Sequence, residues 1–194
     1  MQDHAAPDDE DRELIARVAA GERAAFAALC RRHGGSALRL ARALTANEAT
    51  ADDVLQDAFL AAFRHAKTFR GESTVRAWLF TLTRNAAFHA RKDVARREVP
   101  DTPLLELGLA AGFGDDPERA ASLAEDRVAL EAALATLPEE EREVLLLRDL
   151  EGLTGEETAQ ALAIGVPAMK SRLHRARLRV MAALRRKEVG HAGA

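Results

Sequence analysis

The 194-residue sequence contains one cysteine, no tyrosine and only 4% aromatic residues, and it has no long apolar run. The single thiol of Cys30 excludes an intrachain disulfide, and beside His33 it cannot supply the four ligands of a closed structural metal site. No segment is apolar over the length that crosses a bilayer, and the first residues, "MQDHAAPDDEDRE", are acidic, opposite to a secretory or organellar leader. These absences predict a cytoplasmic protein without membrane insertion.

Signals for β-strands are missing as well. β-branched residues are few, and no stretch alternates apolar and polar side chains as a half-buried strand does. Apolar residues recur instead at helical spacing, which predicts helices at residues 8–20, 22–45, 50–63, 74–92, 117–135, 138–150, 155–163 and 167–187. Gly34 and Gly35 should bend or break the second helix, because glycine disfavours a helix interior. Thr50 should cap the third, with Asp53 three residues on.

Residues 94–116, "VARREVPDTPLLELGLAAGFGDD", contain two prolines and three glycines and show no sustained period, which is typical of a linker. The sequence therefore predicts an all-α fold of two small helical lobes, residues 8–93 and 117–187, joined by a flexible linker at residues 94–116.

The charge is unevenly distributed. Acidic residues outnumber basic ones by 31 to 28, so the net charge alone does not indicate a nucleic-acid partner. Between residues 101 and 160 basic residues are scarce, whereas residues 170–187 contain no acid. A local basic face within a balanced chain is typical of a protein that binds a polyanion.

The segment "LTGEETAQALAIGVPAMKSRLHRARLRVMAAL", from residue 153, has the layout of a helix-turn-helix. Thr154 and Glu157 form a capping box at the start of its first helix. Gly165 permits the tight turn, and Pro167 suits the first turn of the second helix, where its missing N–H costs nothing. An apolar stripe on that second helix is expected to be core: Met169, Leu173, Ala176, Val180 and Leu184.

The stripe leaves a set of polar side chains turned outward: Lys170, Ser171, Arg172, His174, Arg175 and Arg179. They suit the first half of a recognition helix that enters a DNA major groove. A solvated basic face is the simpler alternative, because charge runs usually face water, but the capped helix and turn ahead of them favour DNA.

Two further groups of residues stand out. The third helix has an acidic face, Asp52, Asp53, Gln56 and Asp57, for which spacing alone favours an ordinary solvated surface. The segment "FRGESTVRAWLFTLTRNAAFHARK" places an Arg-Gly loop before a helix that mixes basic and aromatic residues, a combination that can stack on unpaired bases. We assign Trp78, which lies among leucines, to the core and keep Phe69 as the stacking candidate.

Four elements occur in a fixed order: "D-x-x-Q-D-x-F" from residue 53, "F-R-G-x-S" from residue 69, "W-L-x-x-x-x-R-N" from residue 78 and "K-S-R-L-H-R-A-R" from residue 170. With the sequence around them, over nearly the whole chain outside the tails and the linker, they resemble an extracytoplasmic-function (ECF) sigma factor of bacterial RNA polymerase.

This resemblance implies that the first lobe is sigma region 2 and the second is region 4. Region 2 would bind the β′ clamp helices of core polymerase through Asp52, Asp53, Gln56 and Asp57. It would also capture a flipped base of the melted minus-10 element in the loop at residues 69–74. Its DNA contacts would be Phe69, Arg70, Gly71, Ser73, Arg84, Asn85, His89, Arg91 and Lys92. Region 4 would dock on the β flap and read the minus-35 element through the outward residues of its second helix. An anti-sigma factor is a further expected partner.

The sequence therefore predicts a promoter-recognising initiation subunit with no catalytic residue, cofactor or metal of its own. A stand-alone helix-turn-helix regulator is the first alternative, but it leaves the acidic helix and the Arg-Gly loop without a purpose. A sigma-like decoy that binds an inhibitor is disfavoured by the intact basic helix. An enzyme using Cys30, His33 or His89 is disfavoured because no acid is placed to orient them.

Overall fold

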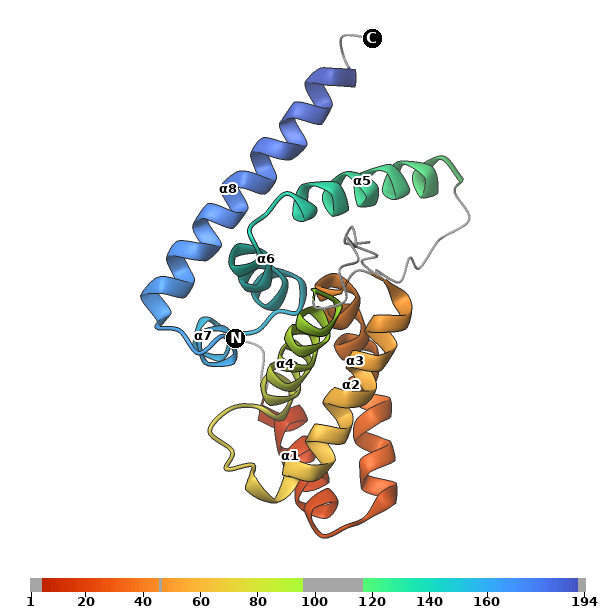
Figure 1. Cartoon of the computed structure of the whole chain (residues 1–194), viewed down its shortest axis with the longest axis vertical. Coiled ribbons are helices and arrows are strands. Elements are labelled where there is room, and N and C mark those ends of the chain that lie inside the picture. Colours follow the sequence, from red (N-terminus) through yellow and green to blue (C-terminus); the bar gives the residue numbers. More distant parts are fainter. Residues whose placement is uncertain (1–4, 46, 96–116, 192–194) are drawn as a thin grey trace.

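The computed structural model describes residues 5–45, 47–95 and 117–191, and every regular element among them is helical, which confirms the all-α fold. The first lobe contains α1 (Ala5–Ala19), α2 (Arg23–Leu44), α3 (Glu48–His65), the short turn η1 (Ala66–Thr68) and α4 (Val75–Ala95). The second contains α5 (Pro117–Ala135), α6 (Glu139–Leu145), the π-helical turn η2 (Leu146–Leu150), α7 (Gly155–Ala161) and α8 (Val166–His191). Figure 1 shows the two lobes, with α8 extending away from the rest. The first two residues of the predicted linker belong to α4, and residues 96–116 lie outside the described residues.

Apolar faces that the helices turn toward one another hold the first lobe together. α3 packs on α2 and α4, and α1 packs along α2 and against η1 and α4. One buried cluster joins all four long helices, with contributions from Ile15, Leu29, Phe59, Val75 and Leu79. Burying a side chain of this size contributes about 1.5–3 kcal/mol, so α1 is an integral part of the lobe.

The predicted interruption of the second helix is wrong. α2 runs unbroken through Gly34 and Gly35. Leu29 lies before the two glycines and Leu40 after them, and both side chains are completely buried. Each glycine costs a helix about 1 kcal/mol relative to alanine, and the burial of this continuous stripe exceeds that cost.

The start of α3 also differs from the prediction. The helix begins at Glu48, and its cap is Asn47, whose Oδ1 accepts a hydrogen bond from the backbone N–H of Thr50 at 2.8 Å. Thr50 therefore lies within the first turn and is not the cap. Asparagine is at least as good a cap as threonine, and the chain offers both within four positions.

The capping box predicted in the second lobe is confirmed. The N–H of Glu157 donates to Thr154 Oγ1 at 3.2 Å, and the N–H of Thr154 donates to Glu157 Oε2 at 2.8 Å. This reciprocal pair fixes the first residue of α7.

The turn between α7 and α8 is built differently from the prediction. The residue in the left-handed region is Ala163, with φ of +53°, and not Gly165. The N–H groups of Ala163 and Ile164 donate to the carbonyls of Gln160 and Ala159, which satisfies the end of α7. Alanine therefore occupies a position that glycine usually fills.

The two lobes share part of their core. Leu40 and Phe80 of the first lobe belong to the same buried cluster as Leu147, Leu153 and Leu162 of the second. α4 contacts α7, and α2 contacts η2. The structure thus places the second lobe against one side of α4 (Figure 1).

Candidate functional site

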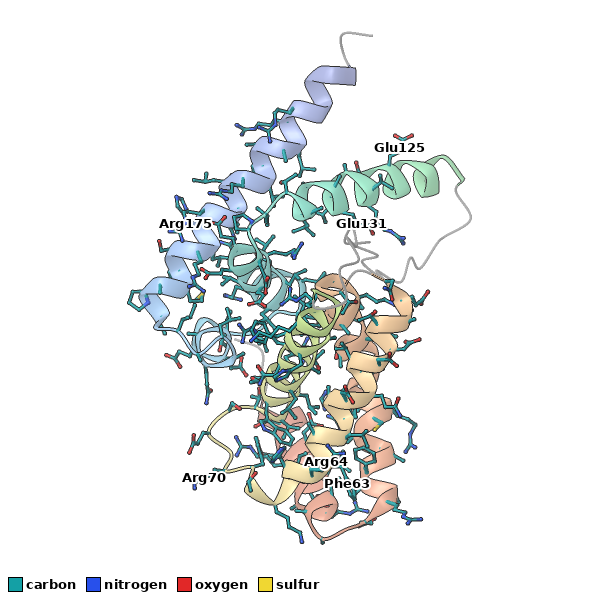
Figure 2. The ribbon with its side chains drawn as sticks, viewed as in Figure 1. Phe63, Arg64, Arg70, Glu125, Glu131 and Arg175 are labelled. Atoms are coloured by element: carbon teal, nitrogen blue, oxygen red, sulfur yellow. The ribbon has the colours of Figure 1, made fainter. Side chains whose placement is uncertain are left out.

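The predicted recognition helix, α8, buries its apolar stripe and exposes its polar side. Met169, Leu173, Ala176 and Val180 are buried, and Leu184 is partly buried against the same cluster. Most of the predicted DNA-contacting side chains are exposed: Lys170, Ser171, His174, Arg175 and Arg179. Arg172 is half-buried. The structure thus presents this set along one side of α8, and Figure 2 shows Arg175 at its outer surface.

The arginines of α8 are not isolated charges. Arg172 lies 2.9 Å from Glu140 of α6, and Arg175 lies 3.0 Å from Glu141. Arg179 reaches the same Glu141 carboxylate at 3.4 Å. The donors of a planar guanidinium are held in a fixed orientation by such pairs. These α6 carboxylates therefore fix where the α8 arginines point.

The predicted base-capture loop, residues 69–74, lies between η1 and α4. Phe69 is half-buried, and its ring centre lies 5.0 Å from that of Trp78, which is also half-buried. Arg70 is exposed at the edge of the first lobe (Figure 2). Gly71 has a φ of +71°, a conformation that disfavours any residue with a Cβ atom. The loop thus has an aromatic floor and a cationic tip.

The residues that sequence reasoning assigned to DNA on α4 divide into two groups. Asn85, His89 and Lys92 are exposed on one side of the helix. Phe88, which was not among the assigned residues, lies between them with 41% of its surface exposed, and the ammonium of Lys92 lies 4.4 Å above its ring. An exposed aromatic ring beside a cation is suited to stacking on a base. Its position three residues after Asn85 was a signal for this role.

Arg84 and Arg91 form the second group, because they face the second lobe. Arg84 Nε lies 3.0 Å from Glu143 of α6, whose side chain is 5% exposed. Arg91 bonds to Glu139 and lies 3.6 Å from Glu143. These two arginines are therefore neutralised by carboxylates of the other lobe.

A third inter-lobe contact involves Glu151, whose side chain is completely buried after η2. Arg76 of α4 lies 3.2 Å from its carboxylate, and Arg39 of α2 lies 3.4 Å from it. Thr74, at the end of the loop, donates to the carboxylate of Glu157 in the α7 capping box. Arg76 was not among the predicted site residues, and its separation in sequence from Glu151 gave no signal.

Helix α6 thus divides its acids between two arginine groups. Glu139 and Glu143, one turn apart, face α4, whereas Glu140 and Glu141 face α8. A helix turns 100° per residue, so residues four apart share a side and their neighbours point elsewhere.

The acidic face of α3 borders a groove. Asp52, Asp53, Gln56 and Asp57 are all exposed. The adjoining groove between α2 and α3 has a volume of about 360 Å³, and its lining is mainly apolar: Phe26, Cys30, Gly34, Asp52, Leu55, Gln56, Phe59 and Leu60. Burial raises the pKa of the Cys30 thiol, which keeps it protonated and uncharged at neutral pH. Leu60 and Phe63 continue the apolar surface and are about two-fifths exposed (Figure 2).

A second apolar groove, of about 410 Å³, lies between α5, η2 and α8. Its lining residues are Leu130, Leu134, Leu145, Leu146, Asp149, Leu150, Arg177, Val180 and Met181. Asp149 and Arg177 form an ion pair at its edge, with a shortest distance of 2.6 Å.

The described residues include neither a metal-binding cluster nor a membrane-spanning helix. Within it, no group of three histidine, cysteine, aspartate or glutamate side chains is placed to hold a metal ion. None of the helices that the structure describes is long and apolar enough to cross a membrane.

Comparison with known proteins accounts for both lobes. A family model of sigma-70 region 2 matches residues 29–97, and a model of sigma-70 region 4 matches residues 127–180. The ECF RNA polymerase sigma factor SigM of Mycobacterium tuberculosis is 36% identical over 170 residues, which are 88% of this chain and 82% of SigM. The chain belongs to the ECF sigma factors of RNA polymerase. As a sigma factor it is a transcription initiation subunit and not an enzyme, which sets aside the enzyme and stand-alone-regulator alternatives.

Solved structures agree with this assignment of the sigma factor. CnrH, solved in complex with the cytosolic domain of CnrY, is 32% identical in sequence to this chain. The match covers 90% of this chain and 96% of CnrH, with a TM-score of 0.66. CnrH is an RNA polymerase sigma factor of Cupriavidus metallidurans. The sigma factor RpoE of Bartonella quintana, in complex with the anti-sigma factor NepR, is 25% identical, covers 82% of this chain and 96% of its own, and has a TM-score of 0.63.

Proposed function

We propose that this sigma factor attaches to core polymerase through α3 and reads promoter DNA through the loop at 69–74, α4 and α8. The observation that carries the proposal is the separation of charge: an exposed acidic face on α3 and an exposed basic face on α8 belong to different lobes. Region 2 would comprise residues 8–93 and region 4 residues 117–187, joined through 94–116. One lobe then offers acids to a basic protein surface, while the other offers cations to phosphate and base edges.

The α2–α3 groove supports attachment to the β′ clamp helices. Its floor is apolar, and Asp52 and Gln56 stand at its rim. An amphipathic helix with basic residues beside its apolar stripe fits such a groove, because it buries the stripe and pairs its charges at the rim. Asp53 and Asp57 would extend the charged rim along α3.

The α5–α8 groove supports docking on the β flap. Leucines from three elements line it, which suits a short apolar helix.

Relatives of this chain were solved with the anti-sigma factor NepR and with CnrY. We propose that an anti-sigma factor also holds this sigma factor inactive, in the cytoplasm where polymerase acts.

Minus-10 recognition would use the exposed residues of the first lobe. Phe69, Arg70, Gly71 and Ser73 belong to the loop, and Asn85, His89 and Lys92 follow on α4 with Phe88 among them. Arg84 and Arg91 would join this set only when the second lobe moves away, because they are paired with α6. The free factor should therefore bind DNA weakly and gain affinity within the holoenzyme.

Substitutions on α8 and α3 test separately the proposed contacts with promoter DNA and with core polymerase. Arg172→Ala and Arg175→Ala should weaken minus-35 recognition by about 1–3 kcal/mol each if the arginine contacts a guanine, while core binding survives. Asp53→Ala with Gln56→Ala should weaken core binding and leave promoter choice unaltered in whatever holoenzyme forms. The measurements are a pull-down on core polymerase and run-off transcription from promoters with intact or scrambled minus-35 elements.

Matched controls exist on both helices. Arg186→Ala removes an exposed α8 arginine two turns beyond Arg179, outside both the proposed DNA set and the lining of the α5–α8 groove. Glu48→Ala removes an exposed α3 acid that is paired with Arg42. Both controls should behave as wild type. Loss of core binding in the Arg172 and Arg175 variants, with minus-35 discrimination kept, would show that the basic face of α8 meets protein.

A further inference from the structure

The loop at residues 69–74 is tied to α1, a helix about sixty positions earlier in the chain. Arg12 of α1 places Nη2 at 3.3 Å from the carbonyl oxygen of Gly71 and at 3.4 Å from that of Ser73. One guanidinium thus donates to two backbone carbonyls of the loop. Both contacts are made to backbone carbonyls, so they act on the path of the loop directly and not through its side chains.

The same guanidinium is oriented from behind by Asp8. Arg12 Nε donates to Asp8 Oδ2 at 2.7 Å. The other carboxylate oxygen, Asp8 Oδ1, accepts the backbone N–H of Val75 at 3.0 Å. Val75 is the first residue of α4 and is completely buried. A single carboxylate therefore joins the start of α4 to the arginine that holds the loop.

Gly71 leaves the space that Arg12 occupies. A Cβ atom at position 71 would lie 2.4 Å from Arg12 Nη1, which is far inside contact distance. The positive φ of Gly71 turns the loop backbone at the same point. The close approach of the guanidinium and the turn of the loop thus depend on the same missing side chain.

The solvent exposure of the Arg12–Asp8 pair indicates that the pair positions the loop more than it stabilises the fold. The Arg12 side chain is 42% exposed and that of Asp8 is 17% exposed. Water screens such a pair, so it contributes little to global stability. The rigid fork of an arginine nevertheless fixes the relative positions of the groups that it bonds.

We propose that Arg12, oriented by Asp8, is a positioning residue for base selection by the loop at 69–74. This inference rests on the proposed function, in which that loop receives a flipped minus-10 base. Arg12 would act through the loop backbone and would not contact the base itself. A lysine in its place keeps the charge and three donors, but its single nitrogen cannot reproduce the fixed spacing between Nε, which bonds Asp8, and Nη2, which bonds the two carbonyls.

The test measures base selection by holoenzyme reconstituted from the full chain and core polymerase. Wild-type holoenzyme first selects a minus-10 sequence from a randomised single-stranded DNA pool. The probes are the selected oligonucleotide, labelled with fluorescein, and copies with one abasic nucleotide at each position in turn. The variants are Arg12→Ala, Arg12→Lys and Asp8→Asn. Arg17→Ala is the control, because Arg17 lies on the same helix, is similarly exposed and pairs with Glu22.

We expect wild-type holoenzyme to bind one of the abasic oligonucleotides roughly tenfold or more weakly than the selected one. This is the affinity that stacking of a single base usually contributes. Arg12→Ala should lose most of this preference by binding the selected oligonucleotide more weakly, yet should bind the abasic copy as wild type does. The preference of Arg12→Lys for the selected over the abasic oligonucleotide should also be well below that of wild type. Asp8→Asn should lower the same preference. Arg17→Ala should match wild type.

Three results would overturn the inference, and they differ from one another. An undiminished preference in Arg12→Ala and Arg12→Lys would show that the loop does not need the fork. Equal weakening of Arg12→Ala on selected and abasic DNA, recovered in Arg12→Lys, would show a phosphate contact. A wild-type holoenzyme that tolerates an abasic nucleotide at every position would remove the base-reading function of the loop itself.

Discussion

Arg84 Nε on α4 lies 3.0 Å from a carboxylate oxygen of Glu143 on α6, a residue 59 positions further along the chain. Arg91 approaches the same carboxylate at 3.6 Å. Both arginines belong to the proposed minus-10 surface, so in this arrangement the second lobe covers part of that proposed surface. Phosphate and Glu143 would compete for the same guanidinium groups.

Replacing Glu143 by glutamine should therefore strengthen DNA binding by the free factor. The substitution preserves side-chain size but removes the charge paired with Arg84 and the more distant of two charges paired with Arg91, which keeps its bond to Glu139. We expect higher affinity for a short single-stranded oligonucleotide, and a salt dependence that steepens by about one released counterion per arginine freed. Fluorescence anisotropy across a salt series measures both quantities.

Glu125→Gln controls for the change in net charge. Glu125 is an exposed acid on α5 (Figure 2). It should raise affinity far less than Glu143→Gln does. If the two variants respond equally, the gain reflects the overall charge of the chain and not the release of α4 arginines.

The left-handed residue in the helix-turn-helix leads to a stability prediction. Ala163 has φ of +53° and is exposed, so glycine there relieves strain without removing a packed side chain. Strain relief of about 1–2 kcal/mol is opposed by about 0.4–1 kcal/mol of added unfolded-chain entropy. Ala163→Gly should therefore raise the free energy of unfolding by about 0.8 kcal/mol at the middle of these ranges, and by at most about 1.6 kcal/mol. Urea unfolding followed by circular dichroism measures this change.

Ala182→Gly provides the opposite sign on the neighbouring helix. Ala182 is exposed within α8, where a glycine should lower the free energy of unfolding by about 0.5–1 kcal/mol. A stability loss in both variants would mean that the turn does not hold Ala163 in the left-handed region.

The helices themselves were predictable because their apolar stripes are local. The stripe from Met169 to Val180 is buried as its spacing predicted, and the capping box of Thr154 and Glu157 formed. The break expected at Gly34 did not form, because local propensity gave no measure of the packing along α2. The tight turn was expected to depend on Gly165, because glycine is common in turns, whereas the residue with a positive φ is Ala163.

The candidate site was predictable only in part. Exposed residues such as Lys170 and Asn85 follow from the helical period. The pairing of Arg84 with Glu143 and the donation from Arg12 to the Gly71 carbonyl join segments far apart in sequence. Such contacts depend on how helices are placed in space, which no single-chain periodicity specifies.

Glu157 should make the stability of the sigma factor depend on pH. Burial alone would raise the pKa of its carboxyl, but hydrogen bonds from Thr74 and Thr154 outweigh it and hold the pKa below its ordinary value of 4.5. A pKa that is lower in the folded state contributes stability above the unfolded value, and that contribution is lost as pH falls through the folded pKa. Glu157→Gln should therefore be less stable than wild type near neutral pH, and the difference should shrink on acidification below the ordinary value.

The urea midpoint of both proteins, measured from neutral pH downward, tests this dependence. Glu156→Gln is the control, because Glu156 is the adjacent acid in the same turn of α7. A constant difference between wild type and Glu157→Gln at all pH values would show that the charge of Glu157 is not what matters, and that the loss of one of its two acceptor oxygens is.

The tip of the loop should act in promoter melting. Arg70 is exposed, whereas the ring of Phe69 packs on Trp78, so Arg70→Ala perturbs the loop without removing a core contact. We expect Arg70→Ala holoenzyme to form fewer open complexes on duplex promoters. Phe69→Ala should do the same and should also lower stability, because it removes part of the aromatic packing.

A premelted template distinguishes a defect in melting from one in attachment. Unstacking a base costs a few kcal/mol, so a template that is already open over the minus-10 element should restore part of the transcription lost in Arg70→Ala. Permanganate reactivity of minus-10 thymines reports the opening directly. Lys67→Ala, which removes an exposed cation from the neighbouring turn η1, is the matched control and should leave reactivity unchanged. Wild-type reactivity in Arg70→Ala and Phe69→Ala on duplex promoters would exclude the loop at 69–74 from melting, since the base it is proposed to hold would then leave the stack without it.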